Sequence, residues 1–159
     1  MSALLKGQVS SGKAYAKITL VAASTWAKSG GFFCKIDANG FASQSVAGDS
    51  VISGWIDVGF DPQDSNVSGG VLTVPASPGE KYTFPFYSIG CVFRVPVLST
   101  TTLAATYGGK LVDLDVTTSK QTVDIDTSTT DQLFVLPPNA EDIADQMVRV
   151  IINPAKFGK

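Results

Sequence analysis

The sequence consists largely of short strand-like runs separated by turn residues. Val, Ile, Phe, Tyr and Thr are concentrated in these runs, and Gly, Pro, Asn, Asp and Ser lie between them. Short strands at this spacing are typical of an all-β barrel or sandwich. We therefore predict a compact β-barrel or sandwich-like domain of short antiparallel strands. The expected strands are residues 31–36, 40–46, 50–60, 69–75, 82–89, 91–98, 110–117, 121–127, 131–137 and 146–154.

Local signals refine this prediction. Asn39 and Gly40 readily adopt the positive φ angles of a tight hairpin turn, so residues 37–40 are expected to join two strands. The segment NAEDIADQ is the best helix candidate, because Asn139 is a good N-cap and Asp142 falls at the third helical position. We expect at most one short helix. Pro85 and Pro96 lie inside strand-like runs and predict sheet edges or bulges.

The first twelve residues differ from the rest of the chain. They show little alternation, and Leu4 and Leu5 form an adjacent apolar pair among glycines and serines. We predict that residues 1–12 form an extended N-terminal arm and that residues 13–159 form a single β-rich domain. A frayed end or an ordinary first strand is the alternative. A chain of 159 residues is within the range of one domain.

Charge and hydropathy exclude several classes of partner. The formal net charge is −2, and the Lys and Arg residues are scattered, so the basic patch expected of a nucleic-acid-binding protein is missing. No apolar run approaches the roughly 20 residues that span a bilayer, and the first residues do not resemble a signal peptide. We expect a soluble protein that is made without export and binds neither nucleic acid nor membrane.

The residues needed for most catalysis are scarce. The sequence contains no histidine, which excludes Ser-His-Asp and Cys-His sites and the usual general base near neutral pH. Glu80 and Glu141 are its two glutamates, and they are expected to be solvated or capping residues. Serines near glycines match neither a nucleophile elbow nor a phosphate loop. We predict that the protein is not an enzyme and binds no cofactor.

Four aspartates alternate with aliphatic residues in GGKLVDLDVTTSKQTVDIDT, and they form the best candidate for a metal site. They are Asp113, Asp115, Asp124 and Asp126. Alternation places Val112, Leu114, Val116, Val123 and Ile125 toward a core and the carboxylates toward water. If the two runs pair, the four carboxylates share one face, which would attract Ca²⁺. Because a flat strand face offers no encircling carbonyl groups, we predict a solvated, metal-free hairpin.

Cysteine and tryptophan leave two further choices open. Cys34 and Cys91 lie far apart among apolar neighbours, so we expect two buried free thiols, with a disulfide as the alternative. Trp26 and Trp55 are candidate partner-binding residues, together with the arm's Leu4 and Leu5. Exposed tryptophans would alternatively stack on sugars, and buried ones would belong to the core or a subunit interface.

Four segments of the chain resemble one known family. They are FASQSVAGDSVISGWIDVGFD, GCVFRVPVL, GGKLVDLDVTTSKQTVDIDT and VRVIINP. Their order is similar to that of the capsid decoration, or cement, proteins of tailed bacteriophages, in which a G-x-F-x-x-P-V strand precedes a G-K-x-x-D-L hairpin and a terminal strand ends in a V-x-I-N-P-like sequence. The matching positions are Gly90, Phe93, Pro96, Val97, Gly109, Lys110, Asp113, Leu114, Val150, Ile152, Asn153 and Pro154.

The resemblance implies a virion structural protein that is made in the host cytoplasm and binds the outer surface of the capsid. Its implied partners are the major capsid protein and neighbouring decoration subunits, commonly as a homotrimer on the capsid. Such a protein stabilises the mature head by bridging major capsid subunits. The alternative function is a receptor- or carbohydrate-binding β-module of a phage tail or surface adhesin.

Overall fold

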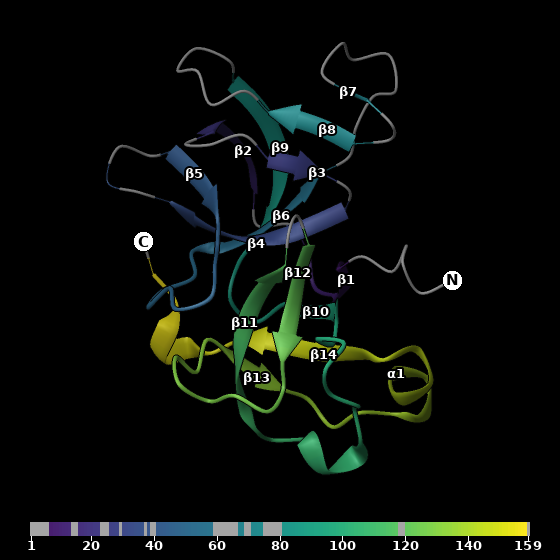
Figure 1. Cartoon of the computed structure of the whole chain (residues 1–159). Coiled ribbons are helices and arrows are strands. Elements are labelled where there is room, and N and C mark those ends of the chain that lie inside the picture. The colour runs from purple at the N-terminus through teal and green to yellow at the C-terminus, as the bar shows by residue number, and fades with distance from the viewer. Residues whose placement is uncertain are drawn as a thin grey trace.

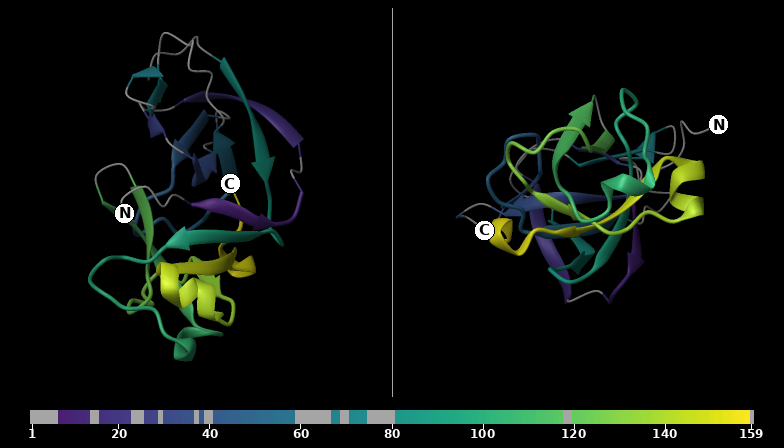
Figure 2. Two further views of the ribbon diagram at one scale, coloured as in Figure 1. Left: turned by 90° about the vertical axis from the view of Figure 1, so that its right-hand side faces the viewer. Right: turned by 90° about the horizontal axis from the view of Figure 1, so that it is seen from below.

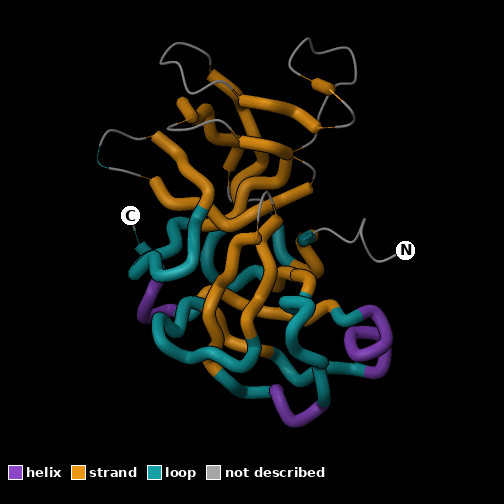
Figure 3. Tube along the Cα trace, in the orientation of Figure 1, coloured by secondary structure: helices purple, strands orange, loops and turns teal. Residues whose placement is uncertain are grey.

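A computed structural model of the protein describes residues 7–13, 16–22, 26–28, 30–36, 38, 41–58, 67–68, 71–74, 81–117 and 120–158. Strands dominate this part of the chain, and the helical segments are short and lie toward its lower rim (Figure 3). The prediction of an all-β fold is therefore confirmed.

The lower part of the molecule is a six-stranded sheet in the order β1-β10-β14-β13-β11-β12 (Figure 1). All of its neighbouring strands are antiparallel. The sheet curls so that β12 approaches the end of β10, because Val97 forms a bridge with Val123, whose carbonyl also accepts from the Leu98 N–H at 2.9 Å. Its strands are β1 (Gln8–Ser11), β10 (Val92–Pro96), β11 (Leu111–Thr117), β12 (Lys120–Asp124), β13 (Leu133–Val135) and β14 (Met147–Ile152).

The upper part contains a ring of paired strands in the order β2-β5-β4-β6-β9. The β2–β5 pair is parallel, and the other pairs of this ring are antiparallel. As a whole the molecule is sandwich-like rather than one closed barrel (Figure 2). The ring consists of β2 (Ala16–Ala22), β4 (Gly30–Ile36), β5 (Phe41–Gln44), β6 (Gly54–Val58) and β9 (Lys81–Tyr87), and beside it lies a small sheet of β3 (Trp26–Lys28), β7 (Val67–Ser68) and β8 (Val71–Val74).

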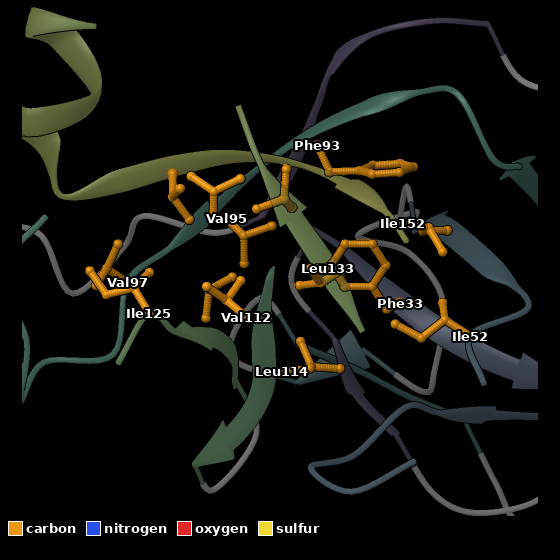
Figure 4. Close-up of a cluster of buried hydrophobic side chains, with 14 of the residues drawn as sticks. Phe33, Ile52, Phe93, Val95, Val97, Val112, Leu114, Ile125, Leu133 and Ile152 are labelled. Atoms are coloured by element: carbon orange, nitrogen blue, oxygen red, sulfur yellow. The ribbon is translucent and has the colours of Figure 1, made fainter. Parts of the chain in front are cut away.

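One hydrophobic core connects the two parts. Its buried side chains come from β4 and β6 of the ring and from β10 to β14 of the sheet (Figure 4). At the junction, the ring centroids of Phe33, Trp55 and Phe93 lie 4.8 to 5.2 Å apart. Aromatic contacts in this range add to the free energy gained by burial alone. The free cysteines Cys34 and Cys91 are both buried, as predicted, and they form no disulfide.

Two buried glutamine side chains also join the parts. Gln121 on β12 accepts a hydrogen bond from the Phe33 N–H at 2.7 Å and donates to the carbonyls of Phe33 and Ser45. Gln132, which precedes β13, accepts from the Leu114 N–H at 2.8 Å and donates to the carbonyls of Val46 and Asp49. Each amide therefore satisfies backbone groups that burial would otherwise leave unpaired.

The predicted local signals are largely confirmed. Helix α1 (Ala140–Asp145) begins with a capping box, because Asn139 accepts from the Asp142 N–H and Asp142 accepts from the Asn139 N–H. The β4–β5 hairpin forms as expected, although Asp37, Asn39 and Gly40 of its turn lie outside the described residues. Two short 3₁₀ helices, η2 (Ala105–Tyr107) and η3 (Pro154–Lys156), complete the described elements.

The predicted arm includes an edge strand. Residues 8–11 form β1, which pairs with β10, so this portion belongs to the sheet, in agreement with the alternative of a first strand. Residues 1–6, including Leu4 and Leu5, lie outside the described residues. The boundary at residue 12 stays a prediction. Strand β2 was not among the expected strands, although its residues ITLV have high strand propensity.

Gly31 provides a test of the aromatic junction. A Cβ atom at this position would lie 2.1 Å from Trp55 Nε1, so Gly31→Ala forces the packed indole to move. We expect a loss of about 1 to 3 kcal/mol in the free energy of unfolding, measured by urea denaturation. Gly158→Ala is the control, because a Cβ there would meet its nearest atom at 3.8 Å. Equal stability of the two variants would contradict this packing.

Candidate functional site

The aspartate hairpin forms, but its carboxylates are not equivalent. Strands β11 and β12 pair with Asp113 opposite Asp124. Val112, Leu114, Val123 and Ile125 point into the core as predicted, whereas Val116 is only partly buried. Asp113 is only 6% exposed, so the prediction that it faces water is wrong. It is covered because the connection from β12 to β13 crosses β11, a long-range feature that the alternating pattern does not encode.

Asp113 holds that crossing segment in place. Its two carboxylate oxygens accept hydrogen bonds from the backbone N–H groups of Thr129, Thr130 and Asp131 at 2.7 to 2.9 Å. In the described part of the chain, no group of three or more Asp, Glu or Cys side chains is placed to hold a metal ion. The role that the geometry assigns to Asp113 is structural.

Asp126 is the exposed carboxylate of the four, and it belongs to a small surface cluster. It accepts from the hydroxyl groups of Thr101 and Tyr107, both at 2.7 Å, while Lys110 Nζ lies 4.4 Å from the Tyr107 ring centroid. The hydrogen bonds from Thr101 and Tyr107, with the nearby Lys110 charge, hold the pKa of Asp126 below its ordinary value. These bonds fasten the loop before β11 to the end of β12.

A second charged cluster lies where α1 packs beside β10 and β14. The buried carboxylate of Asp142 accepts hydrogen bonds from Arg94 Nε at 3.2 Å and from Arg149 Nε at 2.8 Å. Arg94 also contacts Asp145 at 2.8 Å and Glu141 at 3.9 Å. Burial by itself would raise the pKa of Asp142, but the Asn139 N–H and the two guanidinium groups outweigh it and lower that pKa. The cluster fixes the helix on the sheet.

The outer face of the six-stranded sheet carries apolar side chains between these polar groups. Leu111 lies directly opposite Phe134, and Phe134 lies directly opposite Ile151, so the three residues stand side by side across β11, β13 and β14. Leu111 is 37% exposed, and Phe134 and Ile151 are partly exposed. We call these three residues the outer apolar row. Single exposed apolar side chains are normal on a protein surface, whereas a contiguous group of them marks a candidate contact surface.

The residues predicted to contact a partner lie in different parts of the protein, and the structure describes the side chain of only one of them. Trp55 is 1% exposed and packs in the core, so its side chain is not on the surface as a partner contact requires. Trp26 pairs with Val74 through the backbone, and its side chain lies outside the described residues, as do Leu4 and Leu5. The outer apolar row was missed, although the signal was present as apolar residues at outward positions of three strands.

The residues that carry the family resemblance lie mostly inside the six-stranded sheet and its turns. Phe93, Leu114, Val150 and Ile152 are core residues. Asn153 caps η3 and donates to the Asp131 carbonyl at 2.7 Å. These positions therefore specify the fold of the sheet rather than a contact surface.

Comparisons with known proteins identified no similar protein. No family model matches the chain, and neither a curated protein nor a solved structure matches it. Among the described residues, no helix is long and apolar enough to cross a membrane.

Asp142 predicts a specific response to acid. Its folded-state pKa lies below the unfolded value of about 3.9, so its stabilisation is complete above that pH and is lost as the pH falls through the folded-state pKa. Asp142→Asn should therefore be much less stable than the natural protein at pH 7, and the difference should narrow toward about pH 2. Urea denaturation of the two proteins between about pH 2 and pH 7 measures this difference in the free energy of unfolding and its change with pH.

The adjacent Glu141→Gln is the matched control. Glu141 is 75% exposed and reaches Arg94 only at 3.9 Å, so this change should have little effect at any pH. A stability difference for Asp142→Asn that does not vary with pH would show that the ionised carboxylate contributes nothing.

Proposed function

We propose that this protein is a virion structural protein that decorates the outer surface of a tailed-phage capsid. It would stabilise the mature head by bridging major capsid subunits. The observation that carries the proposal is that three of the four resembling segments fall on β10, β11 with β12, and β14, which belong to one sheet. Segments that resemble a family in their order thus also form one structural unit.

The chemistry of the described residues supports a binding role. Their most buried carboxylates, Asp113 and Asp142, are fully engaged with backbone N–H groups or guanidinium groups of the same chain. The outer apolar row, in contrast, is partly exposed to solvent. Leu111, at its end, is the most exposed of the three residues. An interface through such a face requires neither a catalytic group nor a cofactor.

Mass action gives the physical basis for stabilising the head. A ligand that binds the assembled state alone, at a free concentration of 100 times its Kd, stabilises that state by about 2.7 kcal/mol per site. Many copies on a symmetric shell multiply this gain. A modest affinity for each site is therefore sufficient.

The test is co-sedimentation of the purified protein with heads of the virus that encodes it, in precursor and expanded forms. We expect binding to expanded heads and little binding to precursors, because bridging requires the mature subunit spacing. The temperature at which heads release DNA should rise when the protein is bound. Failure to bind expanded heads would contradict the proposal.

A soluble glycan array serves as the second arm of this test. The alternative function, a receptor- or carbohydrate-binding module, needs exposed aromatic side chains, and the burial of Trp55 removes one of the two tryptophans from consideration. Glycan binding without binding to heads would favour that alternative.

A further inference from the structure

Strand β1 stands at one end of the six-stranded sheet, where it lies beside β10 (Figure 2, left). It has four residues, and its register with β10 shifts between Val9 and Ser11. A short edge strand with an interrupted ladder belongs to the least stable part of a sheet. We call residues 7–12, which include β1, the β1 strap.

The side chains and backbone of the strap anchor it weakly. Ser10 and Ser11 are exposed, and Val9 packs against the core while only partly buried. On the side away from β10, the Gly31 N–H donates to the Gly7 carbonyl at 3.4 Å, which is long for a hydrogen bond between backbone groups. Few buried apolar contacts and exposed backbone are the marks of a segment that opens locally.

The strap ends at a residue that can act as a pivot. Gly12 has a φ of +111°, in the region that favours glycine. The chain after it is firmly held, because β2 has six register partners on β9, whereas β1 has three on β10. Rotation at Gly12 therefore lifts the strap while β2 stays paired in the ring.

The Cys91 thiol lies directly beneath this pivot. A Cβ atom on Gly12 would be 2.6 Å from the Cys91 sulfur, so the strap backbone rests on that atom. The thiol donates to the Lys13 carbonyl at 3.7 Å, and Cys91 is 8% exposed. The strap thus contributes directly to the burial of this cysteine.

The Trp55 indole lies beneath the other end of the strap. A Cβ atom on Gly7 would be 2.5 Å from Trp55 Cη2. The indole Nε1, on the same edge of the ring system, has no hydrogen-bond partner among the described residues. A buried donor without a partner destabilises the closed state, so access of water to this group on opening offsets part of the cost of lifting the strap.

We propose that the β1 strap is a lid that opens while the rest of the domain stays folded, and that its opening uncovers the Cys91 thiol and the Trp55 indole. In the open state the edge of β10 also loses its partner strand, so its backbone groups face water. The lid belongs to the isolated chain, and its test requires only the purified protein.

The two cysteines report opening and unfolding separately. Cys91 lies under the strap, whereas Cys34 is 0% exposed on β4, which is paired with both β5 and β6. Burial raises the pKa of the Cys34 thiol and keeps it in the unreactive protonated form. Alkylation of Cys34 therefore requires the ring to unfold.

Alkylation by iodoacetamide, followed by mass spectrometry of the cysteine peptides, measures both rates. The reagent is kept dilute, so that the strap recloses many times before each reaction. In the natural protein, Cys91 should react at least about 100-fold faster than Cys34. Urea below the unfolding transition should accelerate Cys91 only slightly and Cys34 steeply, because lifting the strap exposes much less surface than unfolding does.

Two substitutions distinguish the lid from general loosening of the fold. Val9→Ser weakens the closed state relative to both the open and the unfolded states, so it should raise the rates of Cys91 and Cys34 alike, by about tenfold. Val112→Ala is the control, because Val112 is buried on β11, which stays folded when the strap opens. It should accelerate Cys34 by about tenfold or more and leave Cys91 unchanged. Circular dichroism confirms that each variant is folded.

Three outcomes would overturn the inference. Equal rates for the two cysteines in the natural protein would show that the strap opens only when the whole domain unfolds. A Cys91 rate that Val9→Ser leaves unchanged would show that the reagent reaches this thiol without strap opening. Equal acceleration of both cysteines by Val112→Ala would show that they are exposed in the same event.

Discussion

The hydrogen bonds of two buried glutamine amides are the interactions on which the relation between the two parts of this structure depends. Gln121 and Gln132 extend from the six-stranded sheet and meet backbone groups of β4 and of the loop after β5. A buried backbone group without a hydrogen-bond partner costs about 1 to 3 kcal/mol of folding stability. Loss of either amide would leave several backbone groups unpaired at once. No hydrophobic side chain can replace these contacts, because each amide both donates and accepts.

The same principle extends to the charged residues. Asp113 fixes the segment that crosses β11, and Asp142 fixes α1 on β10 and β14. Both carboxylates are buried, and both are surrounded by donors. These two carboxylates therefore hold segments of the chain together, while Leu111, Phe134 and Ile151 form a partly exposed apolar row on the same sheet.

Local sequence patterns predicted the local structure well. The Asn139 cap, the β4–β5 hairpin and the strands from β8 onward each depend on residues close together in the sequence, and each is present. The burial of Asp113 could not be predicted in this way, because it depends on a connection that returns over a strand already formed. The roles of Gln121 and Gln132 could not be predicted from local patterns either, since their hydrogen-bond partners lie 18 to 88 residues away in the sequence. The sequence does not say which face Trp55 uses, and its packing against Phe33 and Phe93 places it in the core.

We expect the shared core and the two amides to make the ring and the sheet one cooperative unit. Differential scanning calorimetry tests this most directly, because it compares the measured enthalpy of unfolding with the van't Hoff enthalpy. One transition with a ratio of the two enthalpies near unity is the predicted result. Two resolved transitions, or a calorimetric enthalpy well above the van't Hoff value, would show that the ring and the sheet unfold separately and would contradict the account.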